Sequence, residues 1–332
     1  MERNEKWEIL VDRFHKLGGI AENIHQINGE NGRGIFPINK NLKSRIFIPS
    51  NLMIRINDIY LRDGKLRIKE NTEYTNDIKD FFNFYQENFS WGSGGRETTE
   101  SFERGLKLFP DNLKKLIKQY INLDLEDRHK GDWDQIIKRQ FLKSRQFNFN
   151  NLSVICPLLE LVNHKVQSLP FVRNTSGIGT PFYSEIKDEL THYYGYASSL
   201  KRAFDYGFFS QETIIFSLPF NIFLENSGTQ LICKGLDIIN DEININKNGS
   251  KVFIEGLPIA SIRKSSVIKS YFNELITRTN LSNIPNNFFS IIKDYNISRR
   301  KEISKKLKLL YNCSSKIINQ AINYELDSIS QV

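Results

Sequence analysis

The stretch from residue 140 to residue 164 constrains the fold more than any other part of the chain. An apolar, strand-like segment, Leu152 to Cys156, stops at Pro157, which has no N–H to donate to a strand ladder. A leucine-rich turn then leads to Asn163 and His164, two polar side chains directly after an apolar run. If they are buried, both need hydrogen-bond partners. Taken alone, the pair is interpreted as a turn cap and a half-buried histidine.

Three further stretches carry glycine, basic or aromatic residues in a definite order. Residues 31–36 read Asn-Gly-Arg-Gly-Ile-Phe, and residues 143–147, Lys-Ser-Arg-Gln-Phe, form a basic and aromatic helix end before a short polar loop. Residues 193–208 run from Tyr-Tyr-Gly to Tyr-Gly-Phe, with a spacing that suits a short helix from Ser198 to Phe204. Each stretch alone has an ordinary explanation: a hairpin turn, a helix-end cation, or packed core aromatics.

In this order the stretches resemble a SET domain, the fold of S-adenosylmethionine-dependent protein lysine methyltransferases. The branch that they resemble is typified by the Rubisco large-subunit lysine methyltransferase. That branch carries Gly-x-Gly, Ser-Arg-x-Phe, Pro-x-x-Asp-x-x-Asn-His, and Tyr-Gly-x-x-Ser-Asn ending in Tyr-Gly-Phe. This chain departs from the pattern at three positions: Glu160 replaces Asp, Ser199 replaces Asn, and His192 replaces an aliphatic residue.

The resemblance implies an α+β chain with two domains. A β-rich SET domain would cover residues 1–209, with a helical insertion at about 61–143. A mainly α-helical C-terminal substrate-binding domain would cover residues 210–332.

Local patterns predict the individual elements. Apolar periodicity predicts helices at 5–17, 77–89, 109–121, 132–142, 267–277 and 297–324. Residues 91–96 are expected to form a flexible loop. Strands or hairpins are expected at 24–36 around the glycine turn, at 44–49, 182–192 and 214–218, and at 242–254 with its turn at Asn248-Gly249.

The resemblance also implies roles for single residues. The backbone of the glycine turn would bind the methionine part of the cofactor, Arg145 its carboxylate, and Asn163 and His164 its amine and adenine regions. Tyr194 would be the catalytic residue at the point of methyl transfer. The implied cofactor-binding residues are Asn31, Gly32, Arg33, Gly34, Arg145, Asn163, His164 and Tyr194.

The acceptor requires a different kind of environment. A lysine amine arrives protonated, since its pKa is about 10.4, and must become neutral before it attacks a sulfonium methyl group. Burial among aromatic rings, and the approaching positive charge, lower that pKa. The residues that the resemblance assigns to this substrate channel are Ser144, Phe147, Glu160, His192 and Tyr206.

The expected function is therefore S-adenosylmethionine-dependent N-methylation of lysine side chains in a protein or peptide, with S-adenosylhomocysteine as the product. Two alternatives remain open. One is N-methylation of histidine or of a small amine, and the other is a SET module that binds a partner without catalysis.

Composition limits the partners and the location. The 332 residues are 39% hydrophobic and 25% charged, as in a soluble globular protein. The net charge is +8, but the basic residues are scattered, so no specific nucleic-acid binding is expected. Cys156, Cys233 and Cys313 lie far apart and predict neither a disulfide framework nor a metal site. With no secretory signal or membrane span expected, we predict a cytoplasmic protein, with a monomer favoured.

Overall fold

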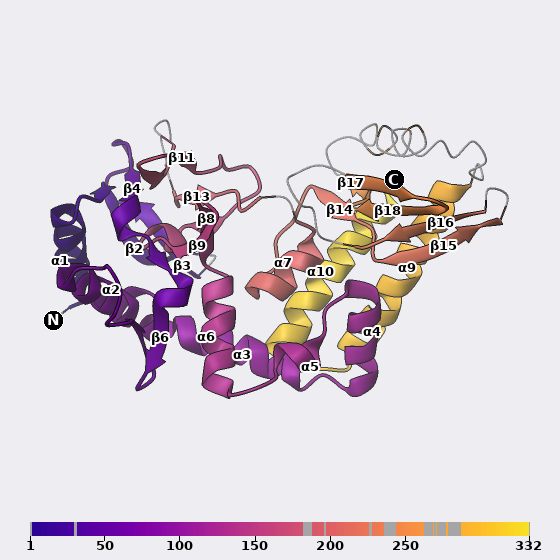
Figure 1. Cartoon of the computed structure of the whole chain (residues 1–332), viewed down its shortest axis with the longest axis horizontal. Helices are drawn as coiled ribbons and strands as arrows, with labels where there is room; N and C mark the ends of the chain where they lie inside the picture. Colours follow the sequence, from indigo (N-terminus) through magenta and orange to yellow (C-terminus); the bar gives the residue numbers. More distant parts are fainter. Residues whose placement is uncertain are drawn as a thin grey trace. The chain divides into compact units, whose positions relative to one another are not determined.

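A computed structural model gives the architecture of the chain (Figure 1). It describes residues 2–29, 32–181, 188–195, 197–225, 228–235, 244–261, 268, 270, 277 and 287–331. The chain forms two compact units, Met1–Glu100 with Gly131–Tyr194, and Ser101–Lys130 with Gly195–Val332. Both units contain helices and strands, so the predicted α+β class is confirmed. The limits of the two functional domains, 1–209 and 210–332, stay a prediction.

The first unit packs two amphipathic helices against its strands. Helix α1 (Arg3–Lys16) buries Trp7, Leu10 and Phe14, as its apolar periodicity predicts. The ring of Phe14 stacks on a phenylalanine of α2 (Asn76–Phe89), Phe81, with centroids 5.7 Å apart. The indole N–H of Trp7 also donates to the carbonyl of Ile24 at 2.9 Å. The N-terminal helix is therefore fixed to both a helix and a strand.

The strands of the first unit form several small sheets. Four antiparallel strands are ordered β1-β4-β12-β11, and three are ordered β5-β9-β8; β2–β3 and β6–β7 are hairpins, and β10 pairs with β13. The bounds are β1 (Ile20–Glu22), β2 (Ile24–Gly29), β3 (Gly32–Pro37), β4 (Arg45–Pro49), β5 (Ile54–Arg55), β6 (Ile59–Arg62), β7 (Lys65–Ile68), β8 (Gln146–Phe149), β9 (Leu152–Ile155), β10 (Asn163–His164), β11 (Val172–Asn174), β12 (Gly177–Gly179) and β13 (Thr191–His192). The hairpin predicted around the glycine turn is β2–β3.

Two local predictions were wrong. Phe147 lies on strand β8 and not at a helix end, because Asn150 and Asn151, both with positive φ, make a two-residue hairpin turn to β9. Residues 91–96 are not a flexible loop: a π-helical turn, η3 (Trp91–Gly95), joins α2 to α3 (Arg96–Lys107). Gly94, with φ +92°, supplies the kink between these two helices.

The predicted helical insertion begins as a hairpin. Strands β6 and β7 occupy residues 59–68, and Asp63-Gly64 forms their turn with positive φ at both residues. The predicted helices within the insertion are present as α2, α4 (Asp111–Ile121) and α6 (Trp133–Lys143), with the short α5 (Leu125–Arg128) between the last two.

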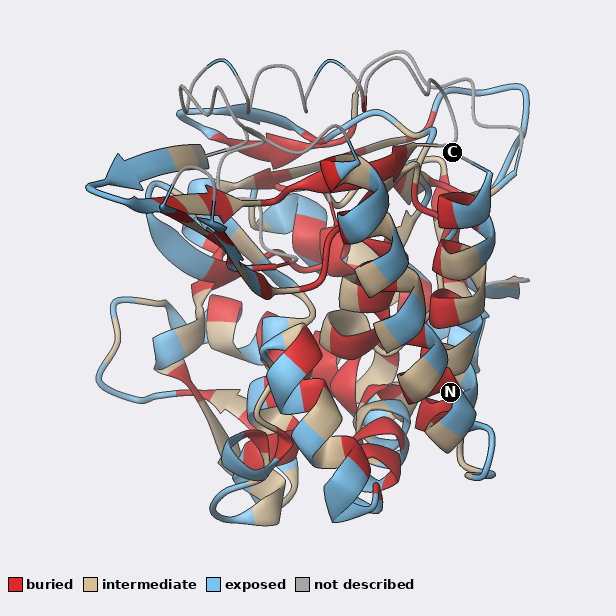
Figure 2. Ribbon diagram, turned by 90° about the vertical axis from the view of Figure 1, so that its right-hand side faces the viewer, coloured by how far each residue is buried: buried red, intermediate tan, exposed pale blue. Residues whose placement is uncertain are grey.

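The second unit combines two sheets with long helices. Its sheets are ordered β15-β16-β18-β17 and β14-β19. The elements are α7 (Ser199–Tyr206), β14 (Ile214–Phe216), β15 (Phe220–Leu224), β16 (Thr229–Cys233), β17 (Asn244–Asn248), β18 (Lys251–Glu255), β19 (Pro258–Ser261), α9 (Phe288–Leu307) and α10 (Cys313–Ser330). Figure 2 shows helices that carry both buried and exposed residues.

The predictions for this unit were largely accurate. The short helix predicted from Ser198 to Phe204 is present as α7, and Ser198 is its N-cap, since its hydroxyl accepts from the N–H of Lys201. The predicted β17–β18 hairpin turns at Gly249 and Ser250, one residue later than predicted. The periodic stretch 297–324 is two helices, with a break between Leu307 and Cys313. The predictions for 182–187 and for most of 267–277 lie outside the described residues.

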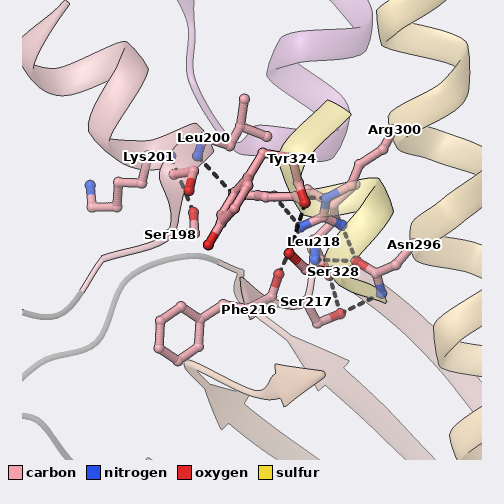
Figure 3. Close-up of polar contacts among 12 residues, drawn as sticks. Ser198, Leu200, Lys201, Phe216, Ser217, Leu218, Asn296, Arg300, Tyr324 and Ser328 are labelled. Atoms are coloured by element: carbon pink, nitrogen blue, oxygen red, sulfur yellow. Dashed lines mark hydrogen bonds and ion pairs between the residues drawn. The ribbon is translucent and has the colours of Figure 1, made fainter. Parts of the chain in front are cut away.

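A buried ion pair joins the helices of the second unit (Figure 3). Arg300 on α9 donates to the carboxylate of Glu325 on α10 at 2.8 Å, and both side chains have an exposed fraction of 0%. The same carboxylate accepts from the N–H of Leu200 on α7 at 2.7 Å. Arg300 also donates to the carbonyl of Phe216 and to the side chain of Asn296. The charges are thus satisfied by partners from four elements.

Among the helices of the described part of the chain, none combines the length and apolar character of a membrane span.

Candidate functional site

A short parallel strand pair brings the Asn-His dipeptide beside the segment that leads to Tyr194. In β10 and β13, Asn163 is opposite Thr191 and His164 is opposite His192. Parallel strands place side chains of equal register on the same side, so the two histidines are neighbours. Three residues that the sequence predicted as functional are therefore assembled by this pairing.

The side-chain amide of Asn163 connects β10 to the glycine turn. Its Nδ2 donates to the backbone carbonyl of Arg33 at 3.1 Å and to Oε1 of Glu189 at 2.5 Å. These two acceptors account for both hydrogens of the amide. A backbone bridge between Ile35 and Leu190 also joins the strand of the glycine turn to the segment that carries Glu189. The predicted Gly-x-Gly and Asn-His motifs thus meet in space.

Gly34 is required by this close approach. A Cβ atom at this position would lie 2.1 Å from Oε1 of Glu189 and 2.9 Å from Nδ2 of Asn163. Gly32, in contrast, has open space around it but a φ of +85°, which an L side chain rarely adopts. The two glycines of the motif are therefore needed for different reasons, one for space and one for backbone conformation.

Tyr194 is held at both its backbone and its hydroxyl. Its N–H donates to Nδ1 of His164 at 3.2 Å, and its hydroxyl donates to the carbonyl of Val162 at 2.6 Å. The rings of His164 and Tyr194 have centroids 5.1 Å apart. Because Nδ1 of His164 accepts, the neutral imidazole carries its proton on Nε2. With its own hydrogen committed to Val162, Oη of Tyr194 acts toward a further group as an acceptor.

Further rings continue from Tyr194. His192 lies 5.7 Å from Tyr194 and stacks on Phe171 with centroids 3.5 Å apart and an interplanar angle of 14°. Its Nδ1 donates to the carbonyl of Leu169 at 3.2 Å, which fixes the ring. Phe171 in turn lies 5.7 Å from Phe147. The predicted channel residues Phe147 and His192 are therefore linked through Phe171.

The carboxylate of Glu160 lies in a second group of polar residues. Its Oε1 accepts from Nε2 of Gln86 at 3.1 Å and from the hydroxyl of Ser90 at 2.9 Å. Its Oε2 lies 3.4 Å from Nε of Arg145. Burial raises the pKa of the Glu160 carboxyl, and Arg145 and the hydrogen bonds counteract this only in part.

Arg145 is held in place by its neighbours. Its guanidinium lies over the ring of Phe141, 4.1 Å from the centroid, and donates to the hydroxyl of Ser144 at 2.9 Å. Its side chain is 26% exposed, whereas that of Glu160 is fully buried. The predicted residues Ser144, Arg145 and Glu160 thus form one contiguous group.

A strained residue precedes Glu160. Leu158 is fully buried and has φ +69° and ψ −46°, at the start of the 3-10 turn η4 (Leu159–Leu161). A bulky residue in this conformation costs about 1–3 kcal/mol. The N–H of Glu160 donates to the carbonyl of Cys156 at 3.1 Å, which closes the turn around Pro157. This turn delivers Glu160 and then Asn163 to their positions.

The roles of two predicted site residues are not tested by these contacts. Asn31 lies outside the described residues. Tyr206 belongs to α7 of the second unit, where its ring lies 6.0 Å from Phe208 and 5.3 Å from the guanidinium carbon of Arg202. Its assignment to the channel stays a prediction.

The sequence predictions missed several residues of these groups. Glu189 follows another acid, Asp188, shortly before β13, and Phe171 follows a proline in a loop, so neither shows a pattern that identifies it. Gln86 and Ser90 sit at the end of α2, 74 and 70 residues from Glu160 along the chain. Only their position one turn apart on a helix could have suggested a common partner.

Comparison with known proteins gives a structural likeness only. No family model matches the chain, and no curated protein matches it. The chain is similar to the SET domain of LSMT bound to lysine and AdoHcy, with a TM-score of 0.47 and 11% identity over 99% of this chain and 90% of that one.

Two further structures are Rubisco LSMT bound to AdoMet (TM-score 0.42, 13% identity) and Rubisco LSMT bound to sinefungin and monomethyllysine (0.43, 12%). Each alignment covers 98% of this chain and 90% of the other. They belong to the branch that the sequence motifs resemble. At these values the likeness fixes no activity, and the function of this chain must be inferred from its own residues.

Proposed function

We propose that the chain is an S-adenosylmethionine-dependent N-methyltransferase that acts on lysine side chains of a protein or peptide. The observation that carries the proposal is the pair of hydrogen bonds made by Asn163, to the carbonyl of Arg33 and to Glu189. They join the glycine turn, the Asn-His motif and the segment before Tyr194, three stretches that are far apart in the sequence.

The residues of the site fit the proposed cofactor. The space beside Gly34 is occupied by Glu189 and Asn163, whereas a Cβ atom built on Gly32 would meet no atom within 4 Å, so a ligand can approach the backbone of β3 closely at Gly32. Nη1 of Arg33 is buried without a hydrogen-bond partner among the described residues. Arg145 would bind the carboxylate of the cofactor, and Asn163 and His164 would bind its amine and adenine regions. When bound, S-adenosylmethionine supplies a methyl group activated by a sulfonium.

Tyr194 has the properties of a residue at the transfer point. Its hydroxyl hydrogen is used by Val162, so its oxygen presents lone pairs. A lone pair can accept a hydrogen bond from an amine and contacts from polarised methyl hydrogens. The hydrogen bond from its N–H to His164 fixes its backbone, and the one from its hydroxyl to Val162 fixes its ring. Tyr194 would therefore orient the acceptor relative to the methyl group.

The aromatic residues next to Tyr194 support an amine acceptor. His192, Phe171 and Phe147 form a continuous series of ring contacts. Aromatic walls exclude water and lower the pKa of an entering ammonium, and the neutral amine is the nucleophile that the reaction needs. A protein or peptide is the proposed partner, because a lysine side chain is long enough to enter such a channel.

The proposal is tested by incubating the protein with S-adenosylmethionine labelled in its methyl group and with a lysate of its own cell. The protein fraction is then hydrolysed to amino acids. Labelled methyl-lysine is expected. Labelled methyl-histidine would favour the histidine methyltransferase, and tight cofactor binding without transfer to any fraction would favour the non-catalytic module.

A further inference from the structure

The sequence predicts a role only for the backbone of Arg33. That role does not explain the position of its side chain. Its Nη1 is buried and has no hydrogen-bond partner among the described residues. Its Nη2 approaches the turn η3, since a Cβ atom built on Gly94 would lie 3.4 Å from it. Burying a guanidinium N–H without an acceptor is costly, and such groups are normally paired.

The same turn connects Arg33 to the group around Arg145. Ser90, directly before η3, donates to Glu160, whose other oxygen faces Arg145. Ser93 within the turn accepts from Arg3 at 3.4 Å. Arg3 and Arg145 both lower the pKa of Arg33, although burial is the larger cause. Several cations therefore surround one turn.

The described acidic residues near the turn do not form an ion pair with Arg33. Glu160 is paired with Arg145. Glu97, at the start of α3, raises the pKa of Arg33 but is exposed to solvent. Arg33 makes no ion pair with any residue in the described part of the chain. Glu160 thus faces Arg145 and leaves Arg33 without a carboxylate partner among the described residues.

We propose that the guanidinium of Arg33 is a second cation for the carboxylate of the cofactor, together with Arg145. This inference rests on the proposed function. The negative charge of Glu160 would weaken carboxylate binding by Arg145 alone, and Arg33 compensates for it. A guanidinium suits this role, because its planar N–H groups match the two oxygens of a carboxylate.

The test compares two ligands that differ in the carboxylate. S-adenosylhomocysteine carries the amino-carboxyl group, and 5′-methylthioadenosine lacks it. Their dissociation constants are measured by calorimetry for the wild type, Arg33→Met and Arg13→Met. Arg13 is the matched control, since it is exposed, stacks on Phe84 and lies about 15 Å along helix α1 from Arg3.

Arg33→Met is expected to lower the affinity for S-adenosylhomocysteine by about 10-fold or more, as for loss of a charge-assisted hydrogen bond. The affinity for methylthioadenosine should stay unchanged. Arg13→Met should leave both unchanged. If Arg33→Met lowers the affinity for both ligands equally, or leaves both affinities at the wild-type value, the inference about Arg33 is wrong but the proposed function is not affected. A wild-type protein that binds neither ligand would refute the proposed function as well. If thermal melting shows that Arg33→Met is unfolded, Arg33→Gln carries the same expectation.

Discussion

The side-chain amide of Asn163 donates to the backbone carbonyl of Arg33, across 130 residues of sequence, at 3.1 Å. The contact fixes the glycine turn against the Asn-His motif without using the side chain of Arg33. The backbone of that residue is thereby committed to the scaffold, while its guanidinium remains available for an anion. One residue thus serves the fold through its carbonyl and, in our proposal, the cofactor through its side chain.

Asn163→Ala is expected to lower the affinity for S-adenosylhomocysteine by about tenfold or more. The variant removes both hydrogen bonds of the amide and should lower the free energy of unfolding by about 1–3 kcal/mol, since the carbonyl of Arg33 and the carboxylate of Glu189 each lose this donor. The measurement is the rise in melting temperature with added ligand. Asn148→Ala on β8 is the control, because that side chain is exposed. A full ligand-induced shift in Asn163→Ala would refute its assignment.

Gly34→Ala and Gly32→Ala should affect different properties: the first should lower ligand affinity, and the second should lower stability. The added methyl group at Gly34 would overlap Oε1 of Glu189, so Glu189 must leave Asn163, and ligand affinity should fall about tenfold. At Gly32 the space is open, and only the positive φ costs about 1 kcal/mol of stability. Melting curves with and without S-adenosylhomocysteine separate the two effects. Equal ligand affinity in both variants would contradict the steric argument.

Tyr194→Phe should slow methyl transfer by about tenfold or more, which corresponds to about 1.4 kcal/mol of transition-state stabilisation. The ring and its packing on His164 are kept, so cofactor affinity should change little. Single-turnover rates on the identified substrate measure the effect. Tyr206→Phe is the comparison and should change the rate less, or change the number of methyl groups added. A wild-type rate in Tyr194→Phe would remove its catalytic role.

Glu160→Gln should make stability less dependent on pH. Burial raises the pKa of this carboxyl in the folded state, so the folded protein binds the proton more tightly than the unfolded chain. Its contribution to stability is therefore present at low pH and is lost as the pH rises through the folded pKa. The variant should melt higher than the wild type near pH 8, and the difference should shrink toward the unfolded pKa of about 4.3.

Glu103→Gln is the matched control, and its effect on the melting temperature should have the opposite sign. Burial tends to raise the pKa of Glu103, but hydrogen bonds from His129 and Arg128 outweigh it, so the net pKa is lowered. Its stabilising contribution is present above the unfolded pKa and is lost as the pH falls through the folded pKa. Glu103→Gln should melt lower than the wild type at neutral pH, with the difference shrinking in acid. The same sign for both variants would contradict these assignments.

Glu325→Ala should destabilise the second unit by about 3–5 kcal/mol, because it leaves the buried charge of Arg300 without its carboxylate. Replacing both partners, as in Arg300→Met with Glu325→Leu, should recover part of the loss. Chemical denaturation of the wild type, Glu325→Ala, Glu325→Leu, Arg300→Met and the double variant measures these changes in stability. If the double variant is as unstable as the sum of the single ones, the pair is not coupled.

Local chemistry in the sequence determined the elements whose residues interact with near neighbours. The apolar face of α1, the short helix α7 and the glycine-containing turns follow from spacing of a few residues, because helix and hairpin periodicity is a local property. The order of the four motifs also pointed to Asn163, His164, Arg145 and Tyr194 from the sequence alone.

Only the tertiary structure decided which side chains meet. The parallel pairing of β10 with β13, the carboxylate of Glu189 on Asn163, and the partners of Glu160 on α2 each join residues 26 or more positions apart. No periodicity encodes such contacts, since they depend on how whole elements pack. For the same reason the sequence assigned Arg33 a role for its backbone, whereas the fold buries Nη1 of its guanidinium and brings the side chain close to the turn η3.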